Sequence, residues 1–133
     1  MSLNDELTAI ETAVTECEQE IASGKISVDA IVRQIRTVAD PNAMIAKAGE
    51  LTKMLIGKSE QLNILRLKEL KHQYPNDSRI NNLGNRAAEC FLKLNSTGLD
   101  ISEELVSPEL KQGVREQNQK MKEGLNLLVA GLR

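Results

Sequence analysis

Aromatic side chains are almost absent from this sequence. Its 133 residues include no tryptophan, one tyrosine (Tyr74) and one phenylalanine (Phe91). Proteins that bind single-stranded nucleic acid stack the bases on aromatic side chains, so we expect no such platform here. The core must be aliphatic, which suits helices packed ridge into groove better than the aromatic and β-branched strands of a sandwich.

Residues that carry metal or acid–base chemistry are scarce as well. His72 is the only histidine, and Cys17 and Cys90 are the only cysteines. One imidazole cannot make the usual multi-histidine zinc site, and both cysteines fall on predicted apolar helix faces, where the thiolate is disfavoured. The sequence has no Glu-x-x-His motif and no acids clustered on an apolar face. We therefore expect no metal, no cofactor and no enzymatic activity.

A phosphate-binding loop is also missing. The fragment Gly57-Lys58-Ser59 resembles the end of one, but Thr52 stands where the first glycine of that motif belongs. The residues before it are helical by pattern, whereas the motif follows a strand. We expect no nucleotide site in this segment.

Long hydrophobic runs are lacking too. No stretch of about 18 apolar residues is present, so we expect no membrane-spanning helix and no membrane partner. The N-terminal segment is acidic and amphipathic, unlike a secretion signal. These features predict a cytoplasmic protein in which both cysteines are buried, reduced thiols.

What the chain does have is apolar residues spaced alternately by three and four positions. The first stripe consists of Leu3, Leu7, Ile10, Val14, Cys17 and Ile21. This period places its members on one helix face, which must be buried against other helices. Capping residues such as Ser27, Asp40-Pro41 and Ser107-Pro108 mark where further helices begin. We expect helices over residues 4–23, 28–39, 41–72, 78–94 and 108–133, with one short helical turn over 101–106.

These stripes predict an all-α fold: a four- to five-helix up-and-down bundle with one long central helix, forming a single domain over residues 1–133. Residues 41–72 make the long helix, about 45 Å in length at 1.5 Å per residue. The alternative is a kink or break near Gly57, because glycine weakens a helix. The apolar stripe of this helix runs through Met44, Ala48, Leu51, Leu55, Lys58, Leu62 and Leu65, with Lys58 its one interruption.

Other apolar residues of 41–72 lie off that stripe and need cover of their own. They are Ile45, Met54, Ile56, Ile64, Leu67 and Leu70. Two arrangements satisfy them. Either the bundle surrounds this helix, or part of the second stripe binds another protein or a second copy of the chain as a homodimer.

The charge is unevenly distributed along the chain. Residues 1–24 hold six acids and no base, whereas residues 25–93 hold twelve bases and seven acids, within a net charge of −2. The densest basic region is formed by Arg66, Lys68, Lys71, Arg79 and Arg86. The acidic and basic faces either pair with each other or receive a charged partner.

We therefore expect a non-enzymatic protein–protein interaction module: a small cytosolic adaptor, regulator or chaperone that presents a helical groove to a partner helix. The residues predicted to bind the partner are Met54, Ile56, Leu67, Leu70, Arg66, Lys68 and Lys71. The alternative is a nucleic-acid-associated regulator that uses the basic region 58–93. Nucleic acid is the less favoured partner, since the sequence pI is about 5.5.

Overall fold

The computed structural model describes residues Met1–Arg133 and contains six α-helices, a short C-terminal 3₁₀-helix and no strand. The elements are α1 (Leu3–Ala22), α2 (Val28–Arg36), α3 (Pro41–Gln61), α4 (Ile64–Gln73), α5 (Ser78–Leu105), α6 (Pro108–Val129) and η1 (Ala130–Leu132). The predicted all-α bundle with a long central helix is therefore confirmed.

Four helices begin at residues whose side chains cap them. Ser27 Oγ accepts a hydrogen bond from Ala30 N at 3.1 Å, and Asp40 Oδ2 accepts one from Ala43 N at 3.1 Å. Ser2 and Asp77 cap α1 and α5 in the same way. Each cap satisfies a backbone N–H that the first helical turn leaves free, which is why the chain enters its helices at these points.

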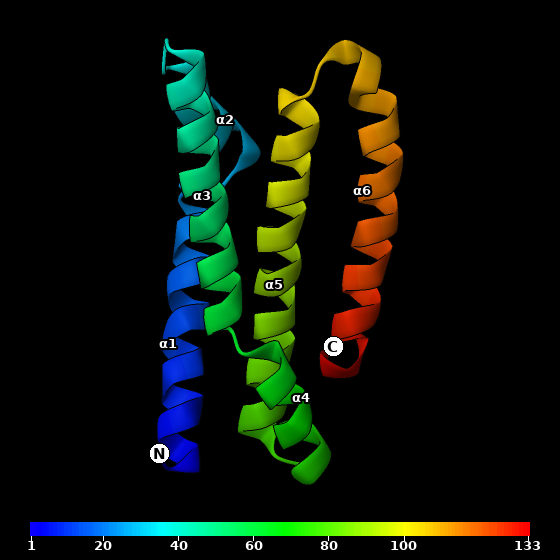
Figure 1. The fold of residues 1–133 in the computed structure, drawn as a ribbon. Helices are drawn as coiled ribbons and strands as arrows, with labels where there is room; N and C mark the ends of the chain where they lie inside the picture. Colours follow the sequence, from blue (N-terminus) through cyan, green and yellow to red (C-terminus); the bar gives the residue numbers. More distant parts are fainter.

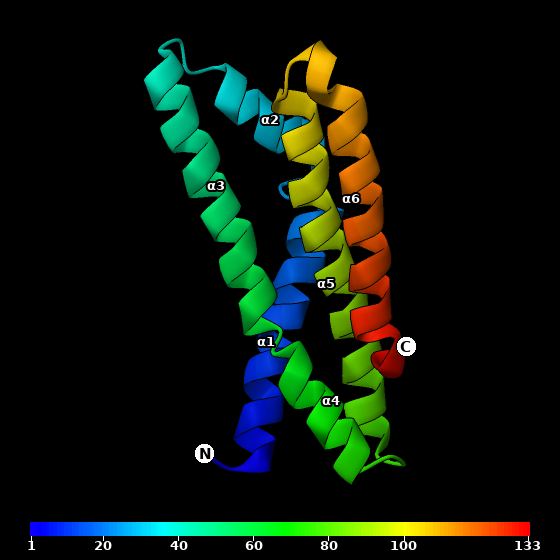
Figure 2. The same cartoon turned by 45° about the vertical axis from the view of Figure 1, so that its right-hand side comes forward.

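The long rods alternate in direction (Figure 1). α1 and α5 run one way, whereas α3, its continuation α4, and α6 run the other way. α5 is the central helix, since it packs against every other element of the chain. α3 leans away from α5 toward its own N-terminal end, and α2 lies between that end and α5, in contact with both (Figure 2).

One continuous aliphatic core joins these helices. Its fully buried side chains include Val14 of α1, Ile31 of α2, Leu62 after α3, Leu67 of α4 and Leu94 of α5. α6 is the exception, because only Asn118 and Val129 of its 22 residues are buried. α1 to α5 therefore form the packed body of the molecule, and α6 lies along one side of α5.

The predicted single helix over 41–72 is wrong, because the chain breaks between α3 and α4. The break is at Asn63, whose φ of 50° and ψ of 52° are left-handed, and not at Gly57, which lies inside α3. Asparagine tolerates this conformation better than most residues. The break resets the helical phase, so that Ile64, Leu67 and Leu70 turn into the core.

The predicted end of a helix at residue 94, followed by a separate turn over 101–106, is also wrong. α5 runs through this segment without interruption to Leu105. Thr97 Oγ1 donates to the carbonyl of Lys93 at 2.7 Å, and Asn95 Nδ2 donates to the carbonyl of Phe91 at 2.8 Å. The polar side chains that suggested a turn instead bond back within the helix.

Candidate functional site

The structure divides the predicted apolar binding residues into two groups. Leu67 and Leu70 are buried in the core of this chain, where they contact its own helices. Ile56 is 51% exposed, and Met54 is partly buried against the core. The break at Asn63 explains this division, because it turns half of the second stripe inward. Of the four apolar residues, only Ile56 presents a large free surface to a partner.

Two of the three predicted basic residues, Arg66 and Lys68, form bonds within the chain. Arg66 Nη2 lies 2.9 Å from Glu6 Oε2, and its hydrogen bonds to Glu6 and Glu69 raise the pKa of the guanidinium. Lys68 Nζ donates to the carbonyl of Leu128 at 2.9 Å. Lys71 lines a shallow cavity beside His72. The structure does not bring these cations together with Ile56 as one surface.

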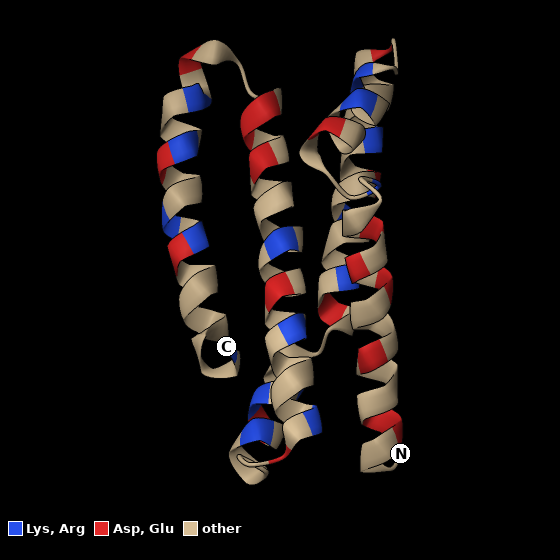
Figure 3. Cartoon of the chain, turned by 180° about the vertical axis from the view of Figure 1, so that it is seen from behind, with Lys and Arg blue, Asp and Glu red and all other residues tan.

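Four of the seven bases in region 58–93 form ion pairs with acids of α1. Figure 3 shows acidic positions along α1 with no basic position among them. Their partners come from α3, α4 and α5. The pairs that join these helices to α1 are Lys58–Glu20, Lys58–Glu16, Arg66–Glu6, Arg79–Glu11 and Arg86–Glu18. The two opposite charge runs seen in the sequence therefore face each other across helix contacts.

A groove lies between α3 and α6, with α5 as its floor. Its upper part has a volume of about 360 Å³. The lining residues are Thr52, Leu55 and Ile56 of α3, Leu94, Asn95, Gly98, Leu99 and Ser102 of α5, and Met121 and Leu125 of α6. None of them is charged, so this part of the groove favours an apolar occupant.

The groove continues one helical turn further toward α4. This lower part has a volume of about 390 Å³ and is lined by Ser59, Glu60, Asn63, Ile64, Leu65, Phe91 and Leu128. At the junction of the two parts, Asn95 Nδ2 donates to Ser59 Oγ at 3.1 Å and ties α5 to α3. Leu65, which the sequence placed on the buried stripe, is 67% exposed here because of the break at Asn63. We call the two parts together the α3–α5–α6 groove.

Two walls of this groove carry exposed apolar side chains. Ile56 of α3 and Met121 of α6 are 51% and 56% exposed, and Leu128 of α6 is 37% exposed. On the floor, Phe91, Asn95 and Gly98 of α5 are half-buried. Exposed apolar side chains on facing helices are typical of a surface that another helix covers.

α6 packs against α5 through both polar and apolar side chains. Asn118 Nδ2 donates to the carbonyl of Leu99 at 2.7 Å, and Lys122 Nζ lies 2.7 Å from Asp100 Oδ1. Arg115 Nε lies 2.7 Å from Glu103 Oε1. α6 is held to α5 by these polar residues together with the half-buried Val114 and Leu125 and the buried Val129. Met121 and Leu128 of α6 line the groove.

The two thiols meet inside the core, between α1 and α5. Cys17 and Cys90 are free and buried, as the sequence predicted. A hydrogen bond between them raises the pKa of Cys90, as does burial, and lowers the pKa of Cys17. Cys90 Sγ also lies 3.8 Å from the carbonyl of Val14. At alkaline pH the folded pair therefore keeps one proton on Cys90, whereas both thiols lose theirs in the unfolded chain.

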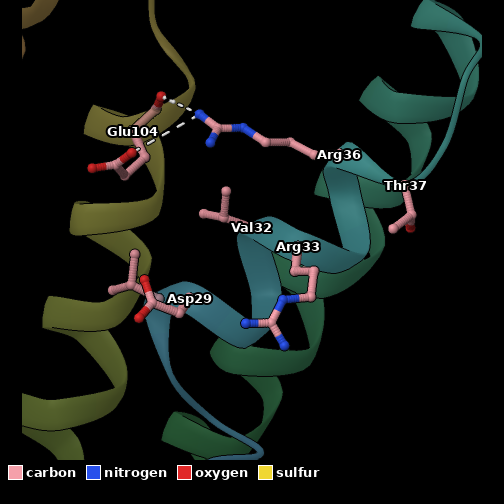
Figure 4. A pocket seen from close by; sticks show the side chains of 7 residues that line it. Asp29, Val32, Arg33, Arg36, Thr37 and Glu104 are labelled. Atoms are coloured by element: carbon pink, nitrogen blue, oxygen red, sulfur yellow. Dashed lines mark hydrogen bonds and ion pairs between the residues drawn. The ribbon is translucent and has the colours of Figure 1, made fainter.

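A second cavity, of about 390 Å³, lies between α2 and the end of α5. Arg36 reaches across it to Glu104, whose carbonyl accepts a hydrogen bond at 3.3 Å (Figure 4). The wall also carries Asp29 and Arg33, so acidic and basic groups alternate around an open mouth. Because both signs of charge line this cavity, it favours neither an anionic nor a cationic ligand. The α3–α5–α6 groove is the stronger candidate site.

Comparison of the chain with protein-family models, with curated proteins and with solved structures finds no match.

No three His, Cys, Asp or Glu side chains are grouped so that they could hold a metal ion. None of the helices combines the length and the apolar character needed to cross a bilayer. The candidate site therefore has to be interpreted from its own geometry.

Proposed function

We propose that this chain is a non-enzymatic protein–protein interaction module that receives a partner helix in the α3–α5–α6 groove. The observation that carries the proposal is the convergence of α3, α5 and α6 on one groove whose upper part is uncharged and whose walls expose Ile56 and Met121. An amphipathic helix laid there buries its apolar face against apolar side chains of all three helices. A small cytoplasmic adaptor, regulator or chaperone uses such a groove.

Two features support this assignment beyond the shape of the groove. Exposed apolar side chains from α3 and α6 lie on the same side of the molecule, and such surfaces mark interaction sites in otherwise polar proteins. Cys17 and Cys90 are both free thiols, which agrees with a reducing compartment such as the cytoplasm.

A capture experiment with groove variants tests the proposal. Ile56→Asp and Met121→Asp place a charge on opposite walls of the groove at exposed positions, so neither change should unfold the chain. Leu3→Asp is the control, because Leu3 is an exposed apolar residue of α1, which does not line the groove. We expect a partner that the wild type and the control retain and that both groove variants lose. A partner retained equally by all four baits contradicts the proposal.

The nucleic-acid alternative has weaker support. Lys58, Arg66, Arg79 and Arg86 each have a carboxylate partner on α1, which leaves few free cations in region 58–93. Phosphate binding weakens steeply as salt rises, whereas binding in an apolar groove does not. Tight, salt-sensitive binding of a DNA or RNA duplex favours this alternative over the groove.

A further inference from the structure

We propose that the helix received by the α3–α5–α6 groove carries acidic side chains on both flanks of its apolar stripe. This inference rests on the proposed function and adds the chemistry of the partner. It starts from the charges along the two rims of the upper, uncharged part of the groove.

One lysine stands on each rim. Lys53 follows Thr52 on α3 and lies one turn before Ile56, and Lys120 precedes Met121 on α6. Both positions lie beyond the groove-facing stripe of their helix, on the side away from α5. Both lysines are exposed, and neither forms an ion pair within the chain.

The other cations nearby differ in this respect. Lys47, Lys58, Arg115 and Lys122 all have a carboxylate partner, at distances between 2.7 and 3.6 Å. The two rim lysines are thus the free cations that flank an apolar trough. A helix seated between them has one flank beside Lys53 and the other beside Lys120, and acids at both flanks complement the rims.

The small residues of the groove agree with a helix as occupant. Gly98 lines the floor, where an added Cβ would meet only Leu55 Cδ1, at 3.9 Å. Glycine in a helix costs about 1 kcal/mol relative to alanine. Gly98 and Ser102 on the floor leave room for a helix backbone to approach closely.

The lower part of the groove also indicates the orientation of the partner helix. Glu60 lines it and stands seven residues, one heptad, after Lys53 on the same rim. A partner helix therefore places an acid opposite Lys53 and, two turns along that flank, a polar or basic side chain opposite Glu60. This change of sign favours one orientation of the partner over the reverse.

Two fluorescently labelled peptides of three heptads test the inference. Both have leucine at the two apolar positions of each heptad; one carries glutamate and the other lysine at the flanking positions. Like charges on the flanks keep each peptide from pairing with itself. For the wild-type chain, we expect fluorescence anisotropy to show roughly tenfold tighter binding of the glutamate peptide than of the lysine peptide, since each exposed ion pair adds a modest factor.

Charge reversal distinguishes the rims from the rest of the surface. The double variant Lys53→Glu/Lys120→Glu should prefer the lysine peptide. The control Lys25→Glu/Lys93→Glu changes two exposed lysines that do not line the groove and should keep the preference of the wild type. Equal binding of both peptides, or a preference that the rim reversal leaves unchanged, overturns the inference.

Further outcomes separate this inference from the proposed function. If Met121→Asp abolishes binding but the flank charges have no effect, the groove stands and its acidic partner does not. If neither peptide binds, or Met121→Asp leaves binding intact, both proposals fail. If the wild type sediments as a dimer that Met121→Asp dissociates, the occupant is a second copy of this chain and the acidic partner is overturned.

Discussion

Lys58 illustrates how a residue that looks irregular in the sequence becomes explicable in the structure. It interrupts an apolar stripe, yet its ammonium lies 2.7 Å from Glu20 Oε1 and 3.9 Å from Glu16 Oε1. The side chains of Lys58 and Glu20 are only 21% and 13% exposed. The lysine belongs to the contact between α3 and α1, where it compensates a carboxylate that water barely reaches.

Replacing Lys58 with leucine should therefore destabilise the chain although it restores the stripe. The change leaves Glu20 with little water and without its nearest cation, which costs about 1–3 kcal/mol for a buried polar group. Urea unfolding measures the loss. Adding Glu20→Leu should recover much of it, and a single variant as stable as the wild type would contradict the role given to this pair.

The two thiols predict a dependence of stability on alkaline pH. The ordinary thiol pKa is 9.0, so the unfolded chain loses both protons above that pH, whereas the raised pKa of Cys90 keeps one proton on the folded pair. The folded state then binds more protons, and stability falls as pH rises above 9, by at most about 1.4 kcal/mol per pH unit. The double variant Cys17→Ala/Cys90→Ala carries neither thiol, so its stability should fall less steeply than that of the wild type. Parallel slopes in chemical denaturation at pH 9 to 10 would rule out this account.

At the scale of elements, the break between α3 and α4 decides which apolar residues become core. Asn63 adopts a left-handed conformation, and the phase change that follows buries Ile64, Leu67 and Leu70. A continuous helix would have kept Leu65 on the same stripe as Leu62. The left-handed conformation of Asn63 thus determines which apolar side chains of α4 face the core.

Substitutions at Asn63 should report this conformation directly. Glycine adopts positive φ freely, so Asn63→Gly should fold with the stability of the wild type or above it. A β-branched residue does not, so Asn63→Val should lose about 1–2 kcal/mol. Thermal unfolding followed by circular dichroism compares the two. Equal stability of the valine and glycine variants would show that the break lies elsewhere.

The starts of the helices could be predicted from the sequence, but two of their boundaries could not. Ser27 and Asp40 are local signals, because each cap bonds to a backbone N–H three residues on. The end of α5 was misplaced because Asn95 and Thr97 are equally suited to a turn and to bonding back within a helix. Only the contact of Asn95 with Ser59 of α3 shows which applies, and that contact is distant in sequence.

The sequence predicted what kind of site the chain has, but not where in the fold that site lies. The sequence indicated a helical groove and included Ile56 among its residues. It assigned Leu67 and Leu70 to the same surface, because a stripe does not reveal where its helix breaks. The wall formed by α6 was missed, because the sequence does not show which side of α6 packs against α5.

At the scale of the whole molecule, the chain consists of a packed body and a sixth helix that packs mainly against α5. Most side chains of α6 are exposed, and at its C-terminal end the 3₁₀-helix places Leu132 against Gly84. A Cβ at Gly84 would lie 3.2 Å from Leu132 Cδ2, so that close approach depends on glycine.

Hydrogen exchange should reveal this difference in stability. Backbone amides over residues 111–125 of α6 should exchange faster than those over 83–101 of α5, because few apolar contacts hold α6 closed. Addition of the glutamate-flanked peptide should slow exchange in α6 and leave α1 unchanged. Uniform protection of α5 and α6 in the free chain would contradict the two-part description.

The most direct test of the groove as a binding site is a titration of the isotope-labelled chain with the glutamate-flanked peptide, followed by the amide signals in NMR. The account predicts shifts over residues 49–60, 91–105 and 114–128, which line or flank the groove, while the outer face of α1 stays unchanged. Shifts confined to α1 or to the cavity beside α2, or no shifts at all, would contradict it.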